Sequence, residues 1–192
     1  GPPTVPDEPF LLVLGDHLYT ARGELSCAQQ LLAAHAESPA KGAVAVAYST
    51  PDEASHFGVV AGSVEETPLK RASSADDLAK LDTASQRKIN VPAFAISKMV
   101  EKPDAAEAAG LAVPGLSDGR PDSVLTVFGM YVLPPRVFDY LDDDVRANRR
   151  QRGVFGLTSA LQRCADGDGL RGIVVDGTRL DLGDATAFAH TR

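Results

Sequence analysis

Apolar residues occur along this chain in short continuous runs, and stretches with a helical pattern separate the runs. The runs Phe10–Leu14 and Ala43–Tyr48 are apolar throughout, which is typical of strands covered on both faces, as in a parallel sheet. Six segments predict strands, at Phe10–Leu14, Ala43–Tyr48, Phe57–Ala61, Ile96–Val100, Val124–Leu133 and Ile173–Val175.

Apolar side chains between these runs recur at helical spacing. The first such set falls at i, i+3, i+4 and i+7 and comprises Ala28, Leu31, Leu32 and His35. Further helices are expected at Ala75–Lys88, Pro134–Leu141, Leu157–Cys164 and Ala185–His190, with a loop or a short helix plus loop over Asp104–Ser123. Strands that alternate with helices predict an α/β fold with a mostly parallel, Rossmann-like sheet.

The composition limits the classes of function and partner. The chain has 192 residues, 44% of them hydrophobic, which is enough for one buried core. Its net charge of −7 argues against nucleic acid or an anionic membrane as the main partner. No run approaches the roughly 20 apolar residues that a membrane-spanning helix needs.

Cysteine usage and the chain's first residues give two further expectations. Cys27 and Cys164 lie in helix-patterned stretches, so we expect buried, reduced thiols and a cytoplasmic or plastid-stroma location. Gly1 and Pro2 are typical of the scar that tag removal leaves, and residues 1–6 are therefore assigned to a scar and linker. Residues 7–192 contain no internal repeat, and we expect one domain or part of one.

Two motifs that could indicate chemistry have simpler interpretations. The segment Gly167–Gly172 matches G-x-G-x-x-G, but a dinucleotide site needs a strand, then the glycines, then a helix. Here the glycines follow a predicted helix and precede a predicted strand, so we interpret them as a turn. Asp142, Asp143 and Asp144 stand together at a helix end, where we expect them to face water rather than bind a metal.

Acidic and basic residues follow several predicted strands. Asp16 comes directly after the first strand, where open α/β sheets place their ligands, although a solvated loop carboxylate is the simpler alternative. Asp181 has a similar position late in the chain, and two such carboxylates could hold one Mg²⁺ if the fold brings them together. Glu101 and Lys102 end another strand, where they suit sugar hydroxyls and a phosphate, with solvent exposure as the alternative.

Six short segments occur in a characteristic order along the chain. They are Phe10–Asp16, Phe57–Val60, Val100–Pro103, Gly129–Leu133, Gly156–Leu161 and Leu180–Asp184. Together they resemble the sugar-1-phosphate nucleotidylyltransferases, and among these most nearly the bacterial-type UTP–glucose-1-phosphate uridylyltransferases. The resemblance implies the nucleotide-diphospho-sugar transferase type of fold and transfer of a uridylyl group from UTP to glucose-1-phosphate or a related sugar-1-phosphate.

The resemblance also implies roles for individual residues. Asp16 and Asp181 would hold Mg²⁺, and Lys102 would bind the sugar phosphate as the catalytic cation. Glu101 would bind sugar hydroxyls. The glycines expected near the sugar are Gly58 and Gly129, of which the first would present its backbone without a blocking side chain.

The chain departs from the family pattern in two places. It lacks the family's N-terminal half, with the glycine-rich loop that cradles the triphosphate, and Gly153–Ser159 lacks the usual acidic and amide residues. One hypothesis is therefore that residues 7–192 are the sugar-binding, C-terminal part of an enzyme and are inactive alone. The alternative is a non-catalytic binding or assembly module. We also expect self-association, or cover by the missing half or another chain, because Phe10–Leu14 would otherwise be a bare apolar edge.

Overall fold

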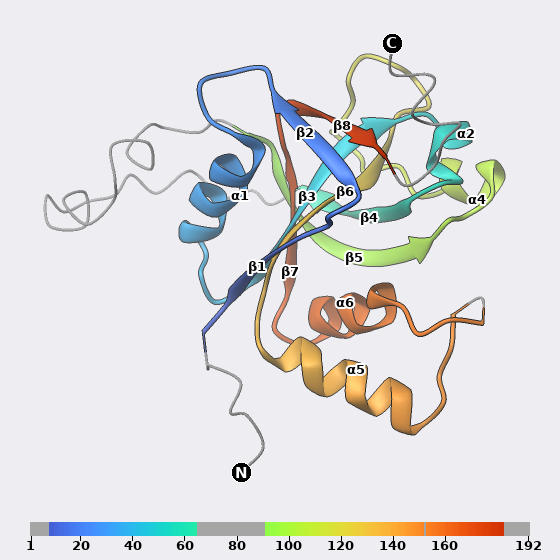
Figure 1. Ribbon diagram of the computed structural model, residues 1–192. Helices are drawn as coiled ribbons and strands as arrows, with labels where there is room; N and C mark the ends of the chain where they lie inside the picture. The colour runs from blue at the N-terminus through green and yellow to red at the C-terminus, as the bar shows by residue number, and fades with distance from the viewer. Residues whose placement is uncertain (1–7, 65–90, 152, 183–192) are drawn as a thin grey trace, which may run out of the picture.

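The computed structural model describes residues 8–64, 91–151 and 153–182, which form one mixed sheet with helices on both faces and a small separate ribbon (Figure 1). Two helices predicted from the sequence, at Ala75–Lys88 and Ala185–His190, lie outside the described residues. The assignment of residues 1–6 to a scar and linker also lies outside them. No described helix is long and apolar enough to cross a membrane.

The main sheet is mixed, and the expectation of a mostly parallel sheet is wrong. Its strands are β1 (Phe10–Val13), β3 (Gly42–Ser49), β4 (Gly58–Val64), β5 (Ala93–Glu101), β6 (Val124–Leu133) and β7 (Leu170–Val174). They are ordered β1-β6-β3-β7-β5-β4, and β4 also pairs with β6. Among the described strands of this sheet, β3 and β7 pair in parallel and every other pairing is antiparallel.

The continuous apolar runs reflect cover on both faces and carry no information on strand direction. The covering helices are α1 (Cys27–Ala36), α5 (Arg136–Arg146) and α6 (Leu157–Asp166). Successive side chains of a strand point to opposite faces, and on β3 Ala43 and Ala45 pack in one cluster with α1. Val44 and Val46 pack in the other cluster, with α5 and α6. Such burial favours apolar residues at every position, whether the neighbouring strands are parallel or antiparallel.

β1 is an edge strand, which corrects the prediction that Phe10–Leu14 is buried on both faces. It pairs antiparallel with the C-terminal part of β6 and, among the described residues, with no other strand. Phe10 stacks on Phe138 of α5, with 5.1 Å between the ring centres. Leu11 and Val13 point to the other face and are 41% and 42% exposed. The run is apolar, but one face of it has little cover.

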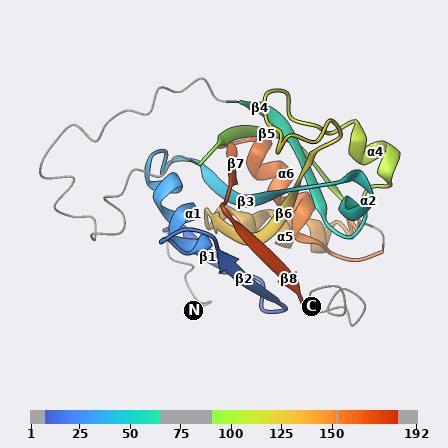
Figure 2. The same cartoon turned by 90° about the horizontal axis from the view of Figure 1, so that it is seen from above.

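Two strands that the hydrophobic pattern did not predict form an antiparallel ribbon beside the main sheet. They are β2 (His17–Ala21) and β8 (Gly177–Asp181), and they run from His17 opposite Asp181 to Ala21 opposite Gly177. Figures 1 and 2 show the two strands side by side, with α1 next to β2. We call this pair the β2–β8 ribbon. It brings Asp16, just before β2, next to the end of β8.

The buried side chain of Gln30 on α1 anchors the β2–β8 ribbon. Its Nε2 donates to the carbonyl oxygens of Leu25 and Asp176, both at 3.1 Å, and its Oε1 accepts from the Asp176 N–H at 2.7 Å. Asp176 directly precedes β8, so these bonds hold the start of that strand against α1. All of this polar surface is paired, which a buried amide requires.

The first predicted helix is confirmed as α1, with a different buried face. It begins with a capping box, in which Ser26 accepts from the Gln29 N–H and the Gln29 side chain accepts from the Ser26 N–H. The buried residues are Cys27, Gln30, Leu31 and Ala34. Leu32 was expected on this face but is 43% exposed.

Three smaller predictions have clear outcomes. Cys27 and Cys164 are buried free thiols, as expected. Residues 167–169 form a turn between α6 and β7, as expected, whereas Leu170, Arg171 and Gly172 already belong to β7. The expectation that Asp142, Asp143 and Asp144 all face water is wrong for Asp144, which is 3% exposed. Arg149 donates to it at 2.8 Å and Arg163 lies 3.6 Å away, and these two positive charges allow its burial.

Candidate functional site

A cavity of about 230 Å³ lies where two strands part from the same edge of β6. β1 pairs with the C-terminal part of β6, and β4 pairs with Leu125 and Thr126. The carbonyl groups of β6 that lie between these two pairings accept hydrogen bonds from other groups. That of Gly129 accepts from the Leu14 N–H at 2.9 Å, and that of Val127 accepts from Arg179 of the ribbon.

All six residues that the family resemblance selected line this one cavity. They are Asp16, Gly58, Glu101, Lys102, Gly129 and Asp181. They come from two parts of the molecule, and a third part completes the wall. The β2–β8 ribbon provides the two aspartates, the main sheet provides the other four, and the first turn of α6 closes the cavity beside Glu101. The structure thus brings together positions up to 165 residues apart in the chain (Asp16 to Asp181).

The end of β5 places Glu101 and Lys102 at the cavity. Glu101 pairs with Gly58 across the sheet, and its Oε2 accepts from the Thr158 hydroxyl at 2.7 Å. Lys102 has a φ of 46°, a left-handed conformation that is unusual outside glycine. Its N–H donates to the Phe57 carbonyl at 3.0 Å, which fixes this turn. A strained residue held in this way at a cavity wall is typical of a functional position.

The two glycines are required for different steric reasons. A Cβ on Gly58 would lie 3.3 Å from both Glu101 Oε2 and Val127 Cγ2, so a side chain would press on the carboxylate. Gly129 has a φ of +94°, and a Cβ there would lie 2.6 Å from the Tyr19 hydroxyl. That hydroxyl donates to the Gly129 carbonyl at 3.1 Å. Gly129 therefore lets the ribbon approach the sheet closely.

The two aspartates occupy adjacent backbone positions at one end of the ribbon. The Leu182 N–H donates to the Asp16 carbonyl at 2.8 Å, which continues the β2–β8 pairing. His17 lies between them. Its Nδ1 donates to Asp16 Oδ1 at 2.6 Å, and its Nε2 is 4.0 Å from Asp181 Oδ2.

This pair of carboxylates fits a divalent cation of the Mg²⁺ type. Mg²⁺ in phosphate-handling sites uses one or two carboxylates, with water and substrate oxygens as its other ligands. Among residues 8–64, 91–151 and 153–182 no group of three or more histidine, cysteine and acidic side chains is arranged to hold a metal. Any ion at Asp16 and Asp181 would therefore need further oxygen ligands from a substrate.

Sequence reasoning missed several residues of the cavity wall, of which Arg179 is the most notable. It lies on β8, two residues before Asp181 and on the same face of the strand. Its guanidinium lies 3.5 Å above the Phe57 ring and donates to the Val127 carbonyl. Burial lowers its pKa to about 10, which the charge of Asp181 partly offsets, so it is a cation at neutral pH. The sequence signal that could have found Arg179 is the two-residue alternation of side chains along a strand, which puts it on the same face as Asp181.

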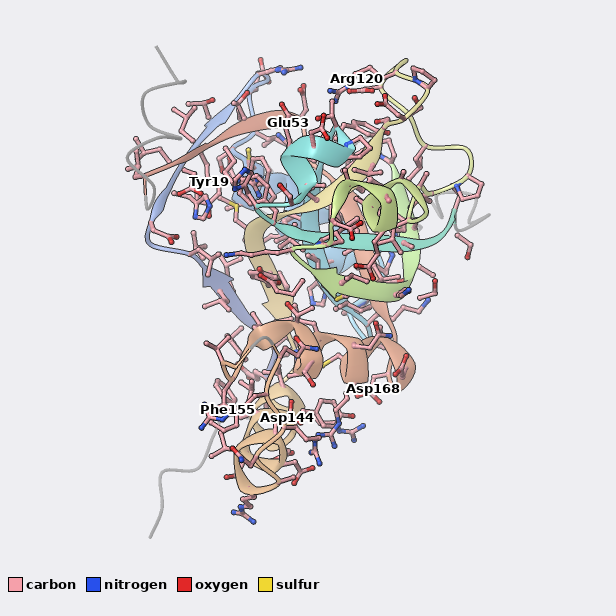
Figure 3. The ribbon with its side chains drawn as sticks, turned by 90° about the vertical axis from the view of Figure 1, so that its right-hand side faces the viewer. Tyr19, Glu53, Arg120, Asp144, Phe155 and Asp168 are labelled. Atoms are coloured by element: carbon pink, nitrogen blue, oxygen red, sulfur yellow. The ribbon has the colours of Figure 1, made fainter. Side chains whose placement is uncertain are left out.

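Two tyrosines lie at this wall: Tyr131 lines the cavity, and Tyr19 bonds to the lining residue Gly129 from behind. Tyr19 of β2 packs on Phe128, with 5.3 Å between the ring centres, and Figure 3 shows it beneath the β2–β8 ribbon, away from Asp144 at the α5 end. Burial raises the pKa of Tyr19, and it raises that of Tyr131 more strongly, with the Glu101 charge adding to the second effect. Both phenols are therefore neutral hydrogen-bonding groups at physiological pH.

The chain matches known proteins over nearly its whole length. The profile of the nucleotidyl transferase family matches residues 4–191. The UTP–glucose-1-phosphate uridylyltransferase of Pseudomonas aeruginosa is 26% identical over 188 residues, which are 98% of this chain and 53% of that protein. UTP–glucose-1-phosphate uridylyltransferase 1 of Staphylococcus saprophyticus is 26% identical over 185 residues, 96% of this chain and 50% of that protein.

Solved structures give the same result for the fold. A UDP-glucose pyrophosphorylase complexed with UDP-glucose superposes with a TM-score of 0.67 at 22% identity, covering 96% of this chain and 54% of that one. A UTP-bound UGPase from Acinetobacter baumannii gives a TM-score of 0.62 at 18% identity, with 96% and 49% covered. These structures share the fold. The chain spans about half the length of the curated relatives it matches.

Proposed function

The chain belongs to the nucleotidyl transferase family, and on this premise we propose that it supplies the sugar-phosphate and metal side of a uridylyltransferase site. The observation that carries the proposal is that the six residues selected from the sequence line one cavity. The reaction would be attack of a sugar-1-phosphate oxygen on the α-phosphorus of UTP, giving a UDP-sugar and pyrophosphate. The names of the relatives support glucose-1-phosphate as the acceptor.

On the sugar side, each residue has a task that its surroundings favour. Lys102 would bind the phosphate as a point charge, and the Phe57 carbonyl holds its backbone in place for this. Glu101 would accept hydrogen bonds from sugar hydroxyls, since the Thr158 hydroxyl occupies only one side of its Oε2 and leaves other lone pairs. Gly58 would leave room for the sugar to approach, because it has no side chain. Gly129 would let the ribbon pack closely against the sheet beside the sugar.

On the metal side, Asp16 and Asp181 would hold Mg²⁺ at the end of the ribbon. When bound, the ion supplies charge neutralisation for the phosphate oxygens that meet at the site. His17 would orient both carboxylates, because it donates to Asp16 and lies beside Asp181. Chemistry of this kind depends on positioning more than on proton transfer, so rigid placement of these side chains matters most.

The triphosphate side would come from a different segment or chain. The sequence of this chain contains no glycine-rich loop bearing arginine and lysine, and its relatives are about twice as long. We therefore propose that the chain alone binds a sugar-1-phosphate but does not turn over. A coupled pyrophosphate-release assay with UTP, glucose-1-phosphate and Mg²⁺ tests this, and steady turnover by the chain alone would contradict it.

Calorimetric titration with glucose-1-phosphate and Mg²⁺ tests the binding role directly. The substitution Lys102→Met should weaken binding tenfold or more, because a charge-assisted hydrogen bond contributes about 1.5–3 kcal/mol. The control is Lys98→Met, on the exposed side of the same strand and outside the cavity wall. Equal affinity of the Lys102→Met variant and the unsubstituted chain would refute the assignment.

A non-catalytic binding or assembly module is the second candidate. The altered segment Gly153–Ser159, which leads into α6 beside the cavity, favours it. The reading frame upstream of Thr4 discriminates between the two. A glycine-rich loop with arginine and lysine there supports the enzyme, and its absence supports the module.

We also propose that the exposed edge of β1 is covered in the native assembly, by a second copy or by another protein segment. Leu11 and Val13 are partly exposed there, beside a strand edge that pairs with no other strand among the described residues. A buried area above about 1,000 Å² is expected for such an interface. Light scattering that finds a monodisperse monomer would contradict self-association.

A reducing compartment, cytoplasmic or plastid-stromal, remains our proposal on the basis of the two buried free thiols.

A further inference from the structure

Arg179 is held in the cavity wall by two contacts that fix its guanidinium. One Nη1 hydrogen bond reaches the Val127 carbonyl, at the stretch of the β6 edge that neither β1 nor β4 covers. The planar group also lies 3.5 Å above the Phe57 ring, which is a close cation–π stack. A guanidinium fixed in this way loses little further rotamer entropy when it binds a ligand.

Most of the hydrogen-bonding capacity of this guanidinium remains for a ligand. A guanidinium carries five N–H donors, and in the described part of the chain Val127 takes one of them. No nitrogen of Arg179 is among the described buried side-chain atoms that have no partner. Arg179 is also one of the residues that line the cavity, so a ligand bound there would be within reach of its guanidinium. A rigid fork of this kind matches two oxygens of a phosphate.

Phe57 connects Arg179 with the other cation of the cavity wall. Its ring carries the guanidinium, and its carbonyl accepts from the Lys102 N–H at 3.0 Å. The ribbon and the main sheet thus each place one cation against the same residue. A phosphate dianion carries about two negative charges and several acceptor oxygens, so two cations at one wall suit it better than they suit a neutral sugar hydroxyl.

We propose that Arg179 is a second anion-binding residue, and that together with Lys102 it holds the phosphate of the sugar-1-phosphate. This inference rests on the proposed function, and it adds a contact from the ribbon to a task so far given to the main sheet. It also gives a reason for the close packing of ribbon and sheet. Binding of the phosphate by both cations would tie the two parts together around the ligand.

The chain contains a matched control for this inference. Arg150 also stacks on a phenylalanine, with its guanidinium 4.1 Å from the centre of the Phe155 ring, and also donates to a backbone carbonyl, that of Gly153 at 3.1 Å. It does not line the cavity. Figure 3 shows Phe155 at the α5 end, away from Tyr19, whose hydroxyl bonds to Gly129 of the cavity wall. Replacing either arginine removes the same kind of contact, but only Arg179 is placed to meet the phosphate.

The test compares Arg179→Met, Arg179→Lys and Arg150→Met by calorimetric titration of glucose-1-phosphate at pH 5 and pH 7.5. We expect Arg179→Met to weaken binding tenfold or more at pH 7.5, as loss of a charge-assisted hydrogen bond predicts. The loss should be smaller at pH 5, where the phosphate, with a second pKa of about 6, is mostly a monoanion. Arg150→Met should leave the affinity unchanged at both pH values.

Two further measurements keep the outcomes separate. If Arg179→Met does not fold, judged by its circular dichroism, Arg179→Lys decides, because it keeps the charge and loses the fork. A three- to tenfold weakening supports the inference, and unchanged affinity overturns it. Equal losses at the two pH values for Arg179→Met would also overturn it, since they indicate a structural role.

Titration with inorganic phosphate separates the two proposals: Arg179-dependent phosphate binding without glucose-1-phosphate binding would contradict only the proposed function. A chain that binds neither contradicts both.

Discussion

The main sheet and the β2–β8 ribbon both contribute side chains to the cavity, yet they are built in different ways. The main sheet has helices on both faces, and Phe94 and Phe128 at its centre are fully buried. The ribbon has two five-residue strands in which partly buried and exposed side chains mostly alternate. Hydrogen bonds from single side chains hold it, above all those of Gln30, Tyr19 and Arg179.

This difference separates stability from positioning. The main sheet owes its stability to apolar burial, which is large and does not depend on direction. The ribbon owes its position to directional hydrogen bonds, each of which contributes about 1 kcal/mol. Local opening should therefore begin at the ribbon, which carries both aspartates and Arg179. The following predictions test this contrast.

The largest effect is expected in the main sheet. Phe94 on β5 lies opposite Gly172 of β7 and fills the space that a side chain there would need. Phe94→Ala should lower the free energy of unfolding by about 3–5 kcal/mol, as measured by denaturant melts. The control, Phe155→Ala at a surface that is 38% exposed, should cost far less. Similar costs for both would show that the sheet is not the stabilising unit.

A smaller, pH-dependent effect is expected where Asp144 joins α5 to α6. Burial alone would raise its pKa, but hydrogen bonds from Ser159 and Arg149 and the charges of Arg149 and Arg163 lower the pKa below 3.8. Its ionised form therefore stabilises the fold above the unfolded-state value, and this contribution is lost as the pH falls through the folded-state value. Asp144→Asn should destabilise by about 2 kcal/mol at pH 7.

The measurement is the difference in unfolding free energy between the two proteins from pH 7 to pH 3. It should shrink toward pH 3. Asp142→Asn is the control. Asp142 forms an exposed i, i+4 ion pair with Arg146, and such a pair contributes about 0.3–0.5 kcal/mol to the free energy of unfolding. A difference that stays constant over this range would contradict the role of the charge.

At the ribbon, Gln30→Ala should act locally. It leaves the Asp176 N–H without its partner and removes one of two hydrogen bonds to the Asp176 carbonyl, which keeps the bond from the Arg22 N–H, at a cost of about 1–2 kcal/mol. Hydrogen exchange should accelerate in β2 and β8 and stay unchanged in β3 and β6. The control is Gln162→Ala on α6, whose amide bonds to the backbone of Ser97 and Met99. It should accelerate exchange in β5 instead, and acceleration of all strands by either variant would contradict separate units.

The smallest effect concerns the two thiols, which report on opening without any substitution. Burial raises the pKa of Cys27 and raises that of Cys164 to about 11, so neither reacts readily in the closed fold. Cys27 lies beneath Gly177 of the ribbon, whereas Cys164 is on α6, in the core cluster that α6 shares with α5. Cys27 should therefore be modified first by a thiol reagent, tenfold or more faster. Equal rates would indicate that the ribbon opens only with the whole molecule.

The amino-acid sequence determined the strands and helices of the main body. Runs such as Val124–Leu133 were located to the residue, because a strand covered on both faces is apolar at most of its positions. It also selected Asp16, Glu101, Lys102 and Asp181, since the family resemblance acts on short segments whose order survives in the chain. That these residues share one cavity followed from neither pattern nor spacing.

Only the tertiary structure decided strand direction, the edge position of β1 and the existence of the ribbon. Direction depends on how connections cross the sheet, which apolar burial does not record. The ribbon strands are short and half exposed, so they carry too little apolar signal to stand out. Arg179 is the clearest case. Its neighbours Val127 and Phe57 are more than 50 residues away, and only the fold places a guanidinium between them.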